Sequence, residues 1–550
     1  MSFGSGADTQ LGGTPPIVPR LLRPTVPAAL LLFPLASVLA YMSQNLKETT
    51  LWDVVPVLAG TWASAVVVWL LVVVLCRRAD AGSAVIACLW VLAGVYYLGL
   101  FGAFNDWIGG DYTLAATLPF VAAGLLLTSF AVYRLPGLNA PIHVVLTVTA
   151  VALVTTPLWR IAVYEWRNGD GRAVYDPDEA AAELARFAGP APGAGAARPP
   201  DIYHFVFDRF GSTDTLARHY DSVATVGGFL ESRGFYVASD SYSNYLKTGQ
   251  SLGSTFYMDY LGLLSGDDRV ASDAWQPVFA MLGDHRVARI LHARGYSVLQ
   301  FGSWWRGTHR NPVADENHPF GLSEFAMYYL RQTVLRTAIG LMPDSRLAGL
   351  LDWDNGQCQR VARQVEAIKA IGVRDQPVYV FAHFLMPHDP FVFAADGGCL
   401  SLDASNARGS RQGYVDQVAY ASRVVETLVD ALQDLEPPPV ILMQSDEGPY
   451  PIRDYAVPWQ EASGEELRAK TGILNAYFFP DGDYRLLRPD ISPVNSYRVV
   501  FNTYLGASYP ILPDRVFAFP DDTRLYEFYD VTERIRGEAV PEDVGGLGSR

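Results

Sequence analysis

The amino-acid sequence predicts a chain of two parts: an N-terminal bundle of five transmembrane α-helices and a C-terminal α/β domain with a mainly parallel sheet. Five apolar runs precede Tyr164, and an Ala/Gly/Pro-rich stretch follows them. From Asp201 onward, short apolar segments alternate with segments of helical period. We therefore expect a transmembrane domain over residues 1–164, a linker over 165–200 and an extracytoplasmic α/β domain over 201–550.

The apolar runs cover residues 26–42, 54–76, 84–104, 114–133 and 142–163. Each is close to the ~20 residues that a helix needs to cross the hydrocarbon core. Five such runs in succession, separated by short polar turns, favour membrane spans over buried soluble helices. A signal peptide is the alternative for the first run, but no small-residue cleavage site follows Tyr41 and the next run begins almost at once, so we expect it to be retained.

The basic residues between the runs predict the orientation of the chain. They cluster before the first run and in the second and fourth connections: Arg20, Arg23, Arg77, Arg78 and Arg134. The first and third connections carry mainly acidic residues: Lys47 with Glu48 and Asp53, then Asp106 and Asp111. With the N-terminus inside, five crossings place everything after Tyr164 outside, whereas four or six would reverse this.

The charge of the chain belongs to its globular part. Up to Tyr164 there are 7 Lys/Arg and 6 Asp/Glu, and the remainder has 35 and 51, a balance of −16. This excludes nucleic acid as a partner, because binding a phosphate backbone needs a cationic face. The same acidity argues against loose electrostatic adhesion to anionic lipid.

Cysteines bear on the compartment. Cys76 and Cys88 fall within apolar runs, where they act as small hydrophobic residues. Cys358 and Cys399 are the two in the globular part, and either a disulfide or two free thiols is compatible with the sequence.

The globular part contains five short apolar or aromatic segments typical of strands: IYHFVF, YSVLQF, VYVFAHF, VILMQS and ILNAYFF. Candidate helices lie near residues 251–264, 285–294, 357–371 and 412–432. Nearly continuous apolar strands that alternate with helices indicate a mainly parallel sheet covered on both faces. In such sheets, ligands bind at the carboxyl ends of the strands.

Acidic and imidazole groups follow three of these strands. Asp208 ends the first, His383 ends VYVFAHF with His388 soon after, and Asp446 and Glu447 follow VILMQS. An acidic residue at a strand end is often a cap of the next turn. Together, however, these groups could form an oxygen-rich cation site with a histidine for proton transfer or substrate contact.

Two further segments carry candidate functional groups. Thr248 precedes a helical segment, so it is either an ordinary N-cap or a hydroxyl at an anion-binding helix terminus, where a metal could make it a nucleophile. In FGSWWRGTHRNP, Arg306 could fork onto a phosphate while Trp304 or Trp305 stacks on a substrate. Buried tryptophans beside a structural arginine are the alternative.

The order of these pieces resembles the alkaline phosphatase superfamily, in particular its membrane-anchored sulfatase-like branch. The resemblance is to lipoteichoic acid synthases and related phosphoglycerol transferases, and phosphoethanolamine transferases have a similar plan. Their five spans and extracytoplasmic domain match nearly the whole chain. The resemblance implies that Asp208 binds a metal, that Thr248 is nucleophile and ligand, and that Trp304 and Arg306, with Trp305 between them, contact the transferred group.

The same resemblance implies roles for the later motifs. His388 in HDPF matches a histidine that precedes Pro-Phe, and Asp446, Glu447 and Gly448 match a metal-binding Asp-His-Gly motif. Glu447 departs from that motif, and a carboxylate there should shift the preference from Zn²⁺ towards Mn²⁺, Mg²⁺ or Ca²⁺. We expect one divalent metal, with Mn²⁺ or Mg²⁺ ahead of Zn²⁺. The sequence has no Cys-x-Pro-x-Arg motif of the sulfatase nucleophile, which argues against sulfate-ester hydrolysis.

The implied reaction moves a phosphoglycerol-type group from a membrane phospholipid, through phospho-threonine, to an envelope glycan or lipid. In it Arg306 stabilises the phosphoryl oxygens, His383 contacts the substrate, and His388 positions the group or relays a proton. Two alternatives are a phosphate or sulfate ester hydrolase of the same fold and a non-catalytic membrane protein with a decayed site.

Overall fold

The computed structural model describes residues 26–537 apart from 111, 169–173, 190–197, 222–224, 267–272, 343–344, 347, 349–356 and 450–457. Arg20, Arg23, Asp111 and most of the Ala/Gly/Pro-rich stretch therefore lie outside the described residues. The chain divides into two compact units. One comprises Met1–Ala40 and Pro56–Pro157, and the other comprises Tyr41–Val55 and Leu158–Arg550.

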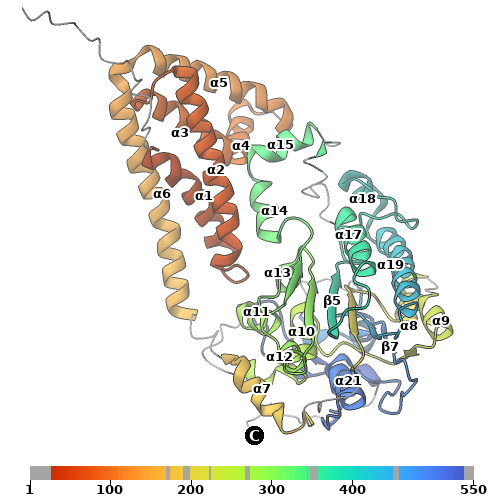
Figure 1. Ribbon diagram of the computed structural model, residues 1–550. Helices are drawn as coiled ribbons and strands as arrows, with labels where there is room; N and C mark the ends of the chain where they lie inside the picture. Colours follow the sequence, from red (N-terminus) through yellow and green to blue (C-terminus); the bar gives the residue numbers. More distant parts are fainter. Residues whose placement is uncertain are drawn as a thin grey trace, which may run out of the picture. The chain divides into compact units, whose positions relative to one another are not determined.

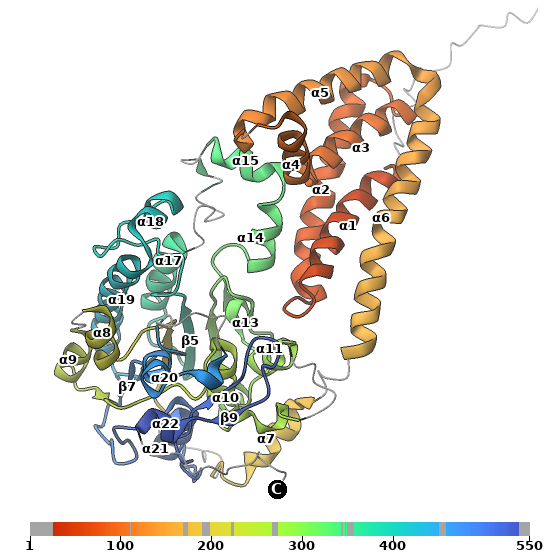
Figure 2. The same cartoon turned by 180° about the vertical axis from the view of Figure 1, so that it is seen from behind.

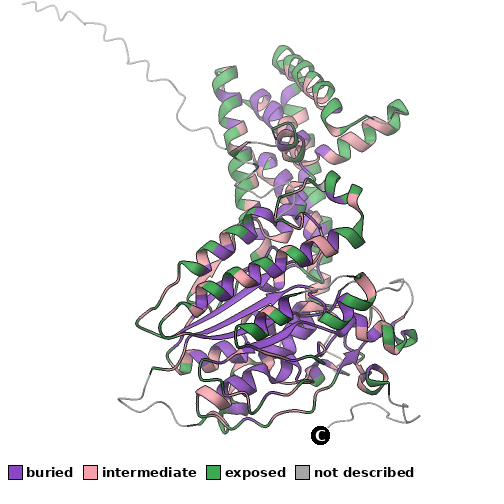
Figure 3. Ribbon diagram, turned by 90° about the vertical axis from the view of Figure 1, so that its right-hand side faces the viewer, coloured by how far each residue is buried: buried purple, intermediate pink, exposed green. Residues whose placement is uncertain are grey.

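The first part of the chain is helical: α1 (Ala28–Gln44), α2 (Leu51–Cys76), α3 (Ala81–Val95), α4 (Tyr97–Ile108), α5 (Leu114–Arg134) and α6 (Asn139–Asn168). Helices α2, α5 and α6, the last with the short helical turn before it, are long and apolar enough to cross a membrane. Most residues of these apolar stretches are not buried inside the protein, as Figure 3 shows. This is the pattern of a surface that faces lipid.

The third apolar run is not one straight helix. It is divided at Tyr96 into α3 and α4, which are bent by 81°, so the described residues contain three spans, or four if this pair is one span. The hydroxyl of Tyr97 donates to the carbonyl of Leu114 at 2.8 Å and lies 3.0 Å from Thr117 Oγ1, which ties the bend to α5. Helix α1, with 17 residues, is shorter than the spans. The sequence prediction of five spans is thus met only in its coarser form, an apolar helical region.

The second unit contains a seven-stranded sheet with strands β1 (Ile202–Phe207), β2 (Tyr236–Val237), β3 (Ser297–Phe301), β4 (Glu316–His318), β5 (Val378–Phe384), β6 (Val440–Gln444) and β7 (Asn475–Phe478). A small second sheet pairs β8 (Phe517–Ala518) with β9 (Tyr529–Asp530). The strands of the large sheet lie in the order β2-β7-β6-β1-β5-β3-β4. Strand β1 is parallel to both neighbours, whereas β7 runs antiparallel to β6 and β2, so the sheet is mixed.

The helices of this unit are α7 (Pro177–Ala185), α8 (Thr213–Tyr220), α9 (Val226–Ser232), α10 (Thr248–Tyr257), α11 (Gln276–Gly283), α12 (Arg286–Ala293), α13 (Arg306–His309), α14 (Glu324–Leu330), α15 (Val334–Gly340), α17 (Cys358–Lys369), α18 (Leu402–Arg408), α19 (Ser410–Gln433), α20 (Gly464–Thr471), α21 (Ser496–Tyr504) and α22 (Thr532–Arg536). The four segments of helical period in the sequence correspond to α10, α12, α17 and α19. Helix α10 is followed by a short 3-10 turn, Leu261–Leu264.

Two apolar layers cover the sheet, as the alternation of side chains along each strand requires. Tyr203, Phe205 and Phe207 of β1 pack with α17 and α19 on one face, while Ile202 and Val206 pack with α10, α12 and α21 on the other. Figures 1 and 2 show α17 and α19 together beside β5. The sheet is therefore buried on both faces, and only the ends of its strands remain for polar chemistry.

A disulfide joins Cys358 at the start of α17 to Cys399 in the loop before α18. The sequence left this disulfide and two free thiols as equal alternatives. Cys88 and Cys76 are free.

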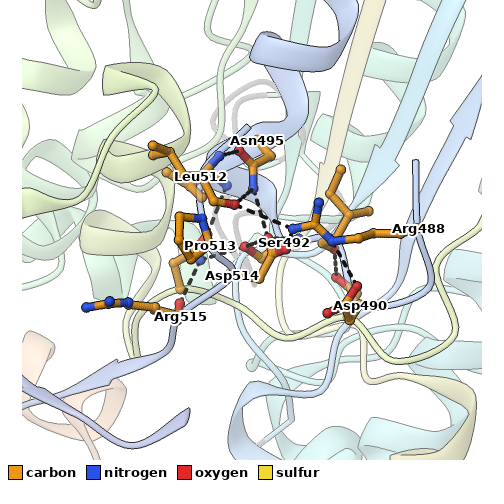
Figure 4. A network of polar contacts seen from close by, with 12 residues as sticks. Arg488, Asp490, Ser492, Asn495, Leu512, Pro513, Asp514 and Arg515 are labelled. Atoms are coloured by element: carbon orange, nitrogen blue, oxygen red, sulfur yellow. Dashed lines mark hydrogen bonds and ion pairs between the residues drawn. The ribbon is translucent and has the colours of Figure 1, made fainter. Parts of the chain in front are cut away.

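A polar network around Asp514 fixes the segment between β7 and β8 (Figure 4). Its carboxylate accepts hydrogen bonds from Ser492 N at 2.8 Å, Ser492 Oγ at 2.6 Å and Asn495 Nδ2 at 2.9 Å, and it pairs with Arg488. The fully buried amide of Asn244 donates to Ser492 Oγ at 2.8 Å, which connects the network to the chain four residues before Thr248. This hydrogen bond connects the chain just before α10 to the network around Asp514.

Candidate functional site

Three buried side chains meet at the carboxyl ends of the central strands. Asp208 directly follows β1, His383 is the penultimate residue of β5, and Asp446 lies two residues after the end of β6. One potential ligand atom from each lies within 4.8 Å of the others. Because β1 lies between β5 and β6, the order of the sheet brings together residues that are far apart in the sequence.

The donor set fits a divalent cation. Asp208 Oδ1 is buried and has no hydrogen-bond partner among the described residues. His383 Nδ1 lies 2.8 Å from Thr308 Oγ1, and its Nε2 lies 3.4 Å from Asp208 Oδ2. When Nδ1 donates to Thr308, the lone pair of Nε2 points toward the carboxylates, which is the usual arrangement of a metal-binding histidine. The sequence predicted His383 as a substrate contact, whereas the structure brings it into this donor group.

The carboxyl groups of Asp208 and Asp446 lie close together, and their pKa values reflect this. Burial raises the pKa of Asp446 to about 7, with further contributions from the charges of Asp208 and Glu447. Burial also acts to raise the pKa of Asp208, but His388, His383 and Arg209 outweigh it, and the pKa is lowered. Carboxylates at such separations repel each other unless a cation lies among them.

Thr248 begins helix α10 and is partly exposed. Its side chain acts to lower the pKa of Asp446, so the hydroxyl lies near that carboxyl. The residue before it, Lys247, provides no side-chain cap for the helix. The hydroxyl of Thr248 thus lies where the unpaired N–H groups of a helix start and the carboxylate group meet.

Glu447 has different partners from Asp446. Its Oε1 accepts from Arg209 Nε at 2.7 Å, and its Oε2 pairs with Lys470 Nζ at 2.8 Å. Burial acts to raise its pKa, but Lys470 and Arg209 outweigh that effect and lower it, so Glu447 remains ionised. The role of Glu447 as a metal ligand stays a prediction.

Gly448 allows the chain to reach Lys470. A Cβ on Gly448 would lie 2.6 Å from the carbonyl oxygen of Ala469 and 2.7 Å from that of Lys470, so no larger residue fits. Its N–H donates to the Lys470 carbonyl at 2.8 Å. The glycine of the Asp446-Glu447-Gly448 motif therefore reflects the close packing of α20.

Arg209 has a backbone φ of 64°, in the left-handed region. This conformation costs a residue other than glycine about 1 kcal/mol, and surrounding contacts must hold it. Its N–H donates to Asp446 Oδ1 at 3.1 Å, and its carbonyl accepts from the hydroxyl of Tyr414 at 2.8 Å. The guanidinium lies between Glu447 and Asp389, with Nη1 3.7 Å from Asp389 Oδ1.

His388 lies beside this group. Its Nδ1 is 3.0 Å from Asp389 Oδ1, and its ring is 6.5 Å from that of Trp304. Burial and Arg209 act to lower its pKa, but Asp208 and Asp389 outweigh them and raise it. His388 can therefore carry a proton near neutral pH.

Trp304, Trp305 and Arg306 lead into α13. The ring of Trp305 lies 6.1 Å from that of His383, which places this segment next to the donor group. Arg306 Nε donates to Asp53 Oδ2 at 2.7 Å, and Nη2 donates to Thr50 Oγ1 at 3.2 Å. The guanidinium also lies 4.4 Å over the ring of Phe279.

A cavity of about 270 Å³ opens beside Arg306. Its wall combines carboxylates, aromatic rings and small polar groups: Tyr41, Asn45, Glu48, Thr49, Asp53, Arg306, Ser323, Glu324, Phe325 and Tyr328. Burial raises the pKa of Glu324 to about 7, and Glu48 adds to the rise. Among the described residues, Arg306, which already pairs with Asp53, is the one cationic side chain that lines the cavity.

The sequence did not single out Arg209, Lys470, Thr308 or Asp53 as functional candidates. Arg209 directly follows Asp208, so its place beside the strand end could have been noticed. Lys470 and Thr308 reach the site through helices that follow other strands, and Asp53 comes from the connection after the first apolar run. No short motif links these residues.

Comparisons with known proteins identify the family of the domain. Residues 227–485 match the Sulfatase family model, a range that contains every predicted site residue except Asp208. A search of curated proteins found no match to this chain.

Solved structures with a similar arrangement include two structures of one phosphoethanolamine transferase and one of a bacterial periplasmic domain. The soluble domain of lipooligosaccharide phosphoethanolamine transferase A from Neisseria meningitidis is 12% identical, with a TM-score of 0.37 over 58% of this chain and 96% of that one. The integral membrane form of that transferase is 13% identical, with a TM-score of 0.35 over 88% and 99%. The C-terminal periplasmic domain of EcEptC from Escherichia coli is 11% identical, with a TM-score of 0.38 over 62% and 96%. Likenesses at this level say nothing about substrate or chemistry in the present chain.

The matched range contains β2 to β7, the acidic end of β6 and the helix start at Thr248, whereas β1 and Asp208 precede it. The predicted resemblance is thereby confirmed at the level of the family. The chain carries a domain that matches the Sulfatase family model over residues 227–485.

Proposed function

We propose that this protein transfers a phospho-group from a membrane phospholipid to a hydroxyl of an envelope glycan or lipid, through a phospho-threonine at Thr248. The observation that supports this most is the meeting of three buried donors, Asp208, His383 and Asp446, at the strand ends, with Thr248 near Asp446 at the start of α10. A nucleophile beside a cation site and a helix start is arranged for attack on an anionic phosphorus centre.

Asp208, His383 and Asp446 would hold one divalent cation, with Mn²⁺ or Mg²⁺ preferred over Zn²⁺, and Thr248 is close enough to complete the set. When bound, the cation would lower the pKa of a neighbouring hydroxyl and neutralise phosphoryl oxygens. Thr308 orients the imidazole of His383 for this role.

The reaction proceeds by two displacements. Thr248 Oγ1 forms a bond to phosphorus while the bond from phosphorus to the diacylglycerol oxygen breaks. The proton released from Thr248 passes through His388 to that leaving oxygen. In the second displacement the oxygen of the acceptor hydroxyl forms a bond to phosphorus while the bond from phosphorus to Thr248 Oγ1 breaks. The proton of the acceptor hydroxyl passes through His388 to Thr248 Oγ1.

Arg306 and the two tryptophans lie where they can bind the rest of the donor. The resemblance to phosphoglycerol transferases favours a phosphoglycerol-type group held by Trp304, Trp305 and Arg306. A phosphoethanolamine-type group is the second candidate, because the cavity beside Arg306 has the carboxylates of Glu48 and Glu324 in its wall. An ammonium group would be stabilised there by charge and by aromatic rings.

The domain works on the outer face of the membrane in this proposal. Counting α1 and the bent pair α3–α4 as spans gives five crossings with α2, α5 and α6. The bond between Cys358 and Cys399 supports an oxidising compartment. Lipid headgroups are then the available donors, and membrane anchoring keeps the domain near them.

The test uses the purified full-length chain in lipid vesicles with Mn²⁺ and headgroup-labelled phosphatidylglycerol or phosphatidylethanolamine. We expect diacylglycerol release and label trapped on the protein, both lost in Thr248→Ala but retained in Thr523→Ala, a control at an exposed threonine. Turnover that survives Thr248→Ala would contradict the phospho-threonine. Release of label to water alone would favour the hydrolase alternative, and the better donor identifies the headgroup.

A further inference from the structure

The residue that departs from the family motif, Glu447, accepts a hydrogen bond from Arg209 and forms an ion pair with Lys470, and it lies outside the group of Asp208, His383 and Asp446. Each carboxylate oxygen has its own partner: Arg209 Nε at 2.7 Å on Oε1 and Lys470 Nζ at 2.8 Å on Oε2. The side chains of Glu447 and Lys470 are each 1% exposed, and that of Arg209 is 11% exposed. A buried carboxylate with both oxygens engaged in this way is poorly placed to coordinate a metal as well.

The three residues form a chain that leads from the interior to the edge of the site. Lys470 lies at its inner end on α20, and Arg209 lies at its outer end between Asp208, Asp389 and Glu447. The side chain of Arg209 approaches the donor group through Nε, which lies 3.9 Å from Asp208 Oδ1, and its backbone N–H reaches Asp446 Oδ1 at 3.1 Å. Of the three paired residues, Arg209 is therefore the one that lies beside the donor group, where a substrate phosphate would bind.

The backbone at Arg209 supports a role for its side chain. The left-handed conformation there favours glycine, yet an arginine occupies it and is held by Tyr414 and Asp446. The carboxylate of Glu447 then fixes the direction of the guanidinium. A planar fork held in this way binds phosphate oxygens better than a mobile cation does.

We propose that Glu447 is a positioning residue rather than a metal ligand, and that it fixes Arg209, backed by Lys470, as a binding group for the phosphate of a phosphodiester substrate. This role of Glu447 rests on the proposed function in one respect, namely that the strand-end donors form the active site. It explains why a carboxylate can stand at this place in the motif without closing the site to an anion.

The experiment measures metal content and phosphate binding, so it does not depend on turnover. The full-length protein is saturated with Mn²⁺, dialysed and analysed for bound metal, and titrated with inorganic phosphate by calorimetry. The variants are Glu447→Gln, Arg209→Lys and Asp446→Asn, with Glu316→Gln as a control at another glutamate bonded to an arginine. A double variant, Glu447→Gln with Lys470→Met, avoids an unneutralised buried lysine if the single variant folds poorly.

We expect Glu447→Gln and the double variant to keep one Mn²⁺ per chain, whereas Asp446→Asn loses it. Both should bind phosphate at least tenfold more weakly, as should Arg209→Lys, and Glu316→Gln should match the original protein. If Glu447→Gln or the double variant loses Mn²⁺ as Asp446→Asn does, Glu447 is a ligand and the proposal is wrong. It is equally wrong if phosphate binding is unchanged in all three, or absent from the original protein. Phosphate binding of this kind without any lipid turnover would contradict the proposed transfer and leave the role of Glu447 intact.

Discussion

Arg306 is bonded through its Nε to Asp53, a residue 253 positions earlier in the chain. The two side chains are each 19% exposed, and Thr50 donates to the same carboxylate oxygen through both its N–H and its hydroxyl. The connection between α1 and α2 therefore contributes to the wall of the cavity in the second unit. Arg306 is held in place before any substrate arrives.

Replacing Asp53 should weaken catalysis without unfolding the domain. Asp53→Asn removes a charge-assisted hydrogen bond of ~1.5–3 kcal/mol, so the guanidinium of Arg306 is less ordered. We expect kcat/KM for the lipid donor to fall about tenfold, measured by diacylglycerol release. Asp214→Asn, which breaks an exposed pair with Arg218, is the matched control and should have no effect. An unchanged kcat/KM in Asp53→Asn would show that the pair does not serve Arg306.

Glu324 should make stability depend on pH. Its pKa is raised from 4.5 to about 7 in the folded protein, so the folded state keeps this proton to higher pH than the unfolded state does. The contribution of Glu324 to the free energy of unfolding should therefore fall as pH rises from about 4.5 to about 7. Above pH 7 this contribution should no longer change. Glu324→Gln should flatten the melting temperature between pH 5 and pH 8.

The control for this prediction is Glu316→Gln, because Arg374 lowers the pKa of Glu316. Glu316 is then ionised in both states throughout that range and should leave the pH dependence unchanged. If Glu324→Gln melts with the same pH dependence as the original protein, the raised pKa is not a property of the folded chain. An amine-bearing donor should also bind more tightly above pH 7, when Glu324 is charged.

Removing the metal should destabilise the domain. A cation bound only to the folded state adds RT ln(1 + [L]/Kd) to the free energy of unfolding, about 2.7 kcal/mol at a concentration of 100 Kd. We expect Mn²⁺ to raise the melting temperature and a chelator to reverse the rise. Asp208→Asn and Asp446→Asn should abolish the response, and Asp214→Asn should retain it. A response that persists in both site variants would place the cation elsewhere.

Breaking the disulfide should lower stability but spare the chemistry. The bond between Cys358 and Cys399 closes a loop with a sequence separation of 41. Chain entropy gives such a loop a contribution of about 4 kcal/mol. We expect the Cys358→Ser/Cys399→Ser variant to melt at a lower temperature and to keep its kcat at 25 °C. An equal melting temperature in oxidised and reduced samples would contradict this.

The sequence predicted the sheet and the position of acidic groups at its strand ends, for a physical reason. Apolar strands buried on both faces leave a strong pattern, and acidic residues directly after them, such as Asp208 and Asp446, are conspicuous. Helix starts such as Thr248 are visible in the same way. The candidate donors therefore came from local patterns alone.

Contacts that depend on tertiary packing could not be predicted in this way. The pairing of Glu447 with Lys470 depends on how α20 packs behind β6, and that of Arg306 with Asp53 depends on a connection far away in the sequence. The break of the third apolar run at Tyr96 lies beside a contact between Tyr97 and Thr117, two residues that belong to different apolar runs. The direction of β7 depends on the path of its connection, because strand composition does not encode direction.

The order of the strands has a consequence for how the site comes into being. Its three donors lie at the carboxyl ends of β5, β1 and β6, which are adjacent in the sheet. These strands are far apart in the sequence and are therefore made at widely different times during synthesis. A nascent chain that ends before β6 has no complete donor group, and a one-residue slip of β1 would turn Asp208 to the other face. Tight capture of a cation would then report that the centre of the sheet has formed in register, so metal loading could serve cells as a test of correct folding.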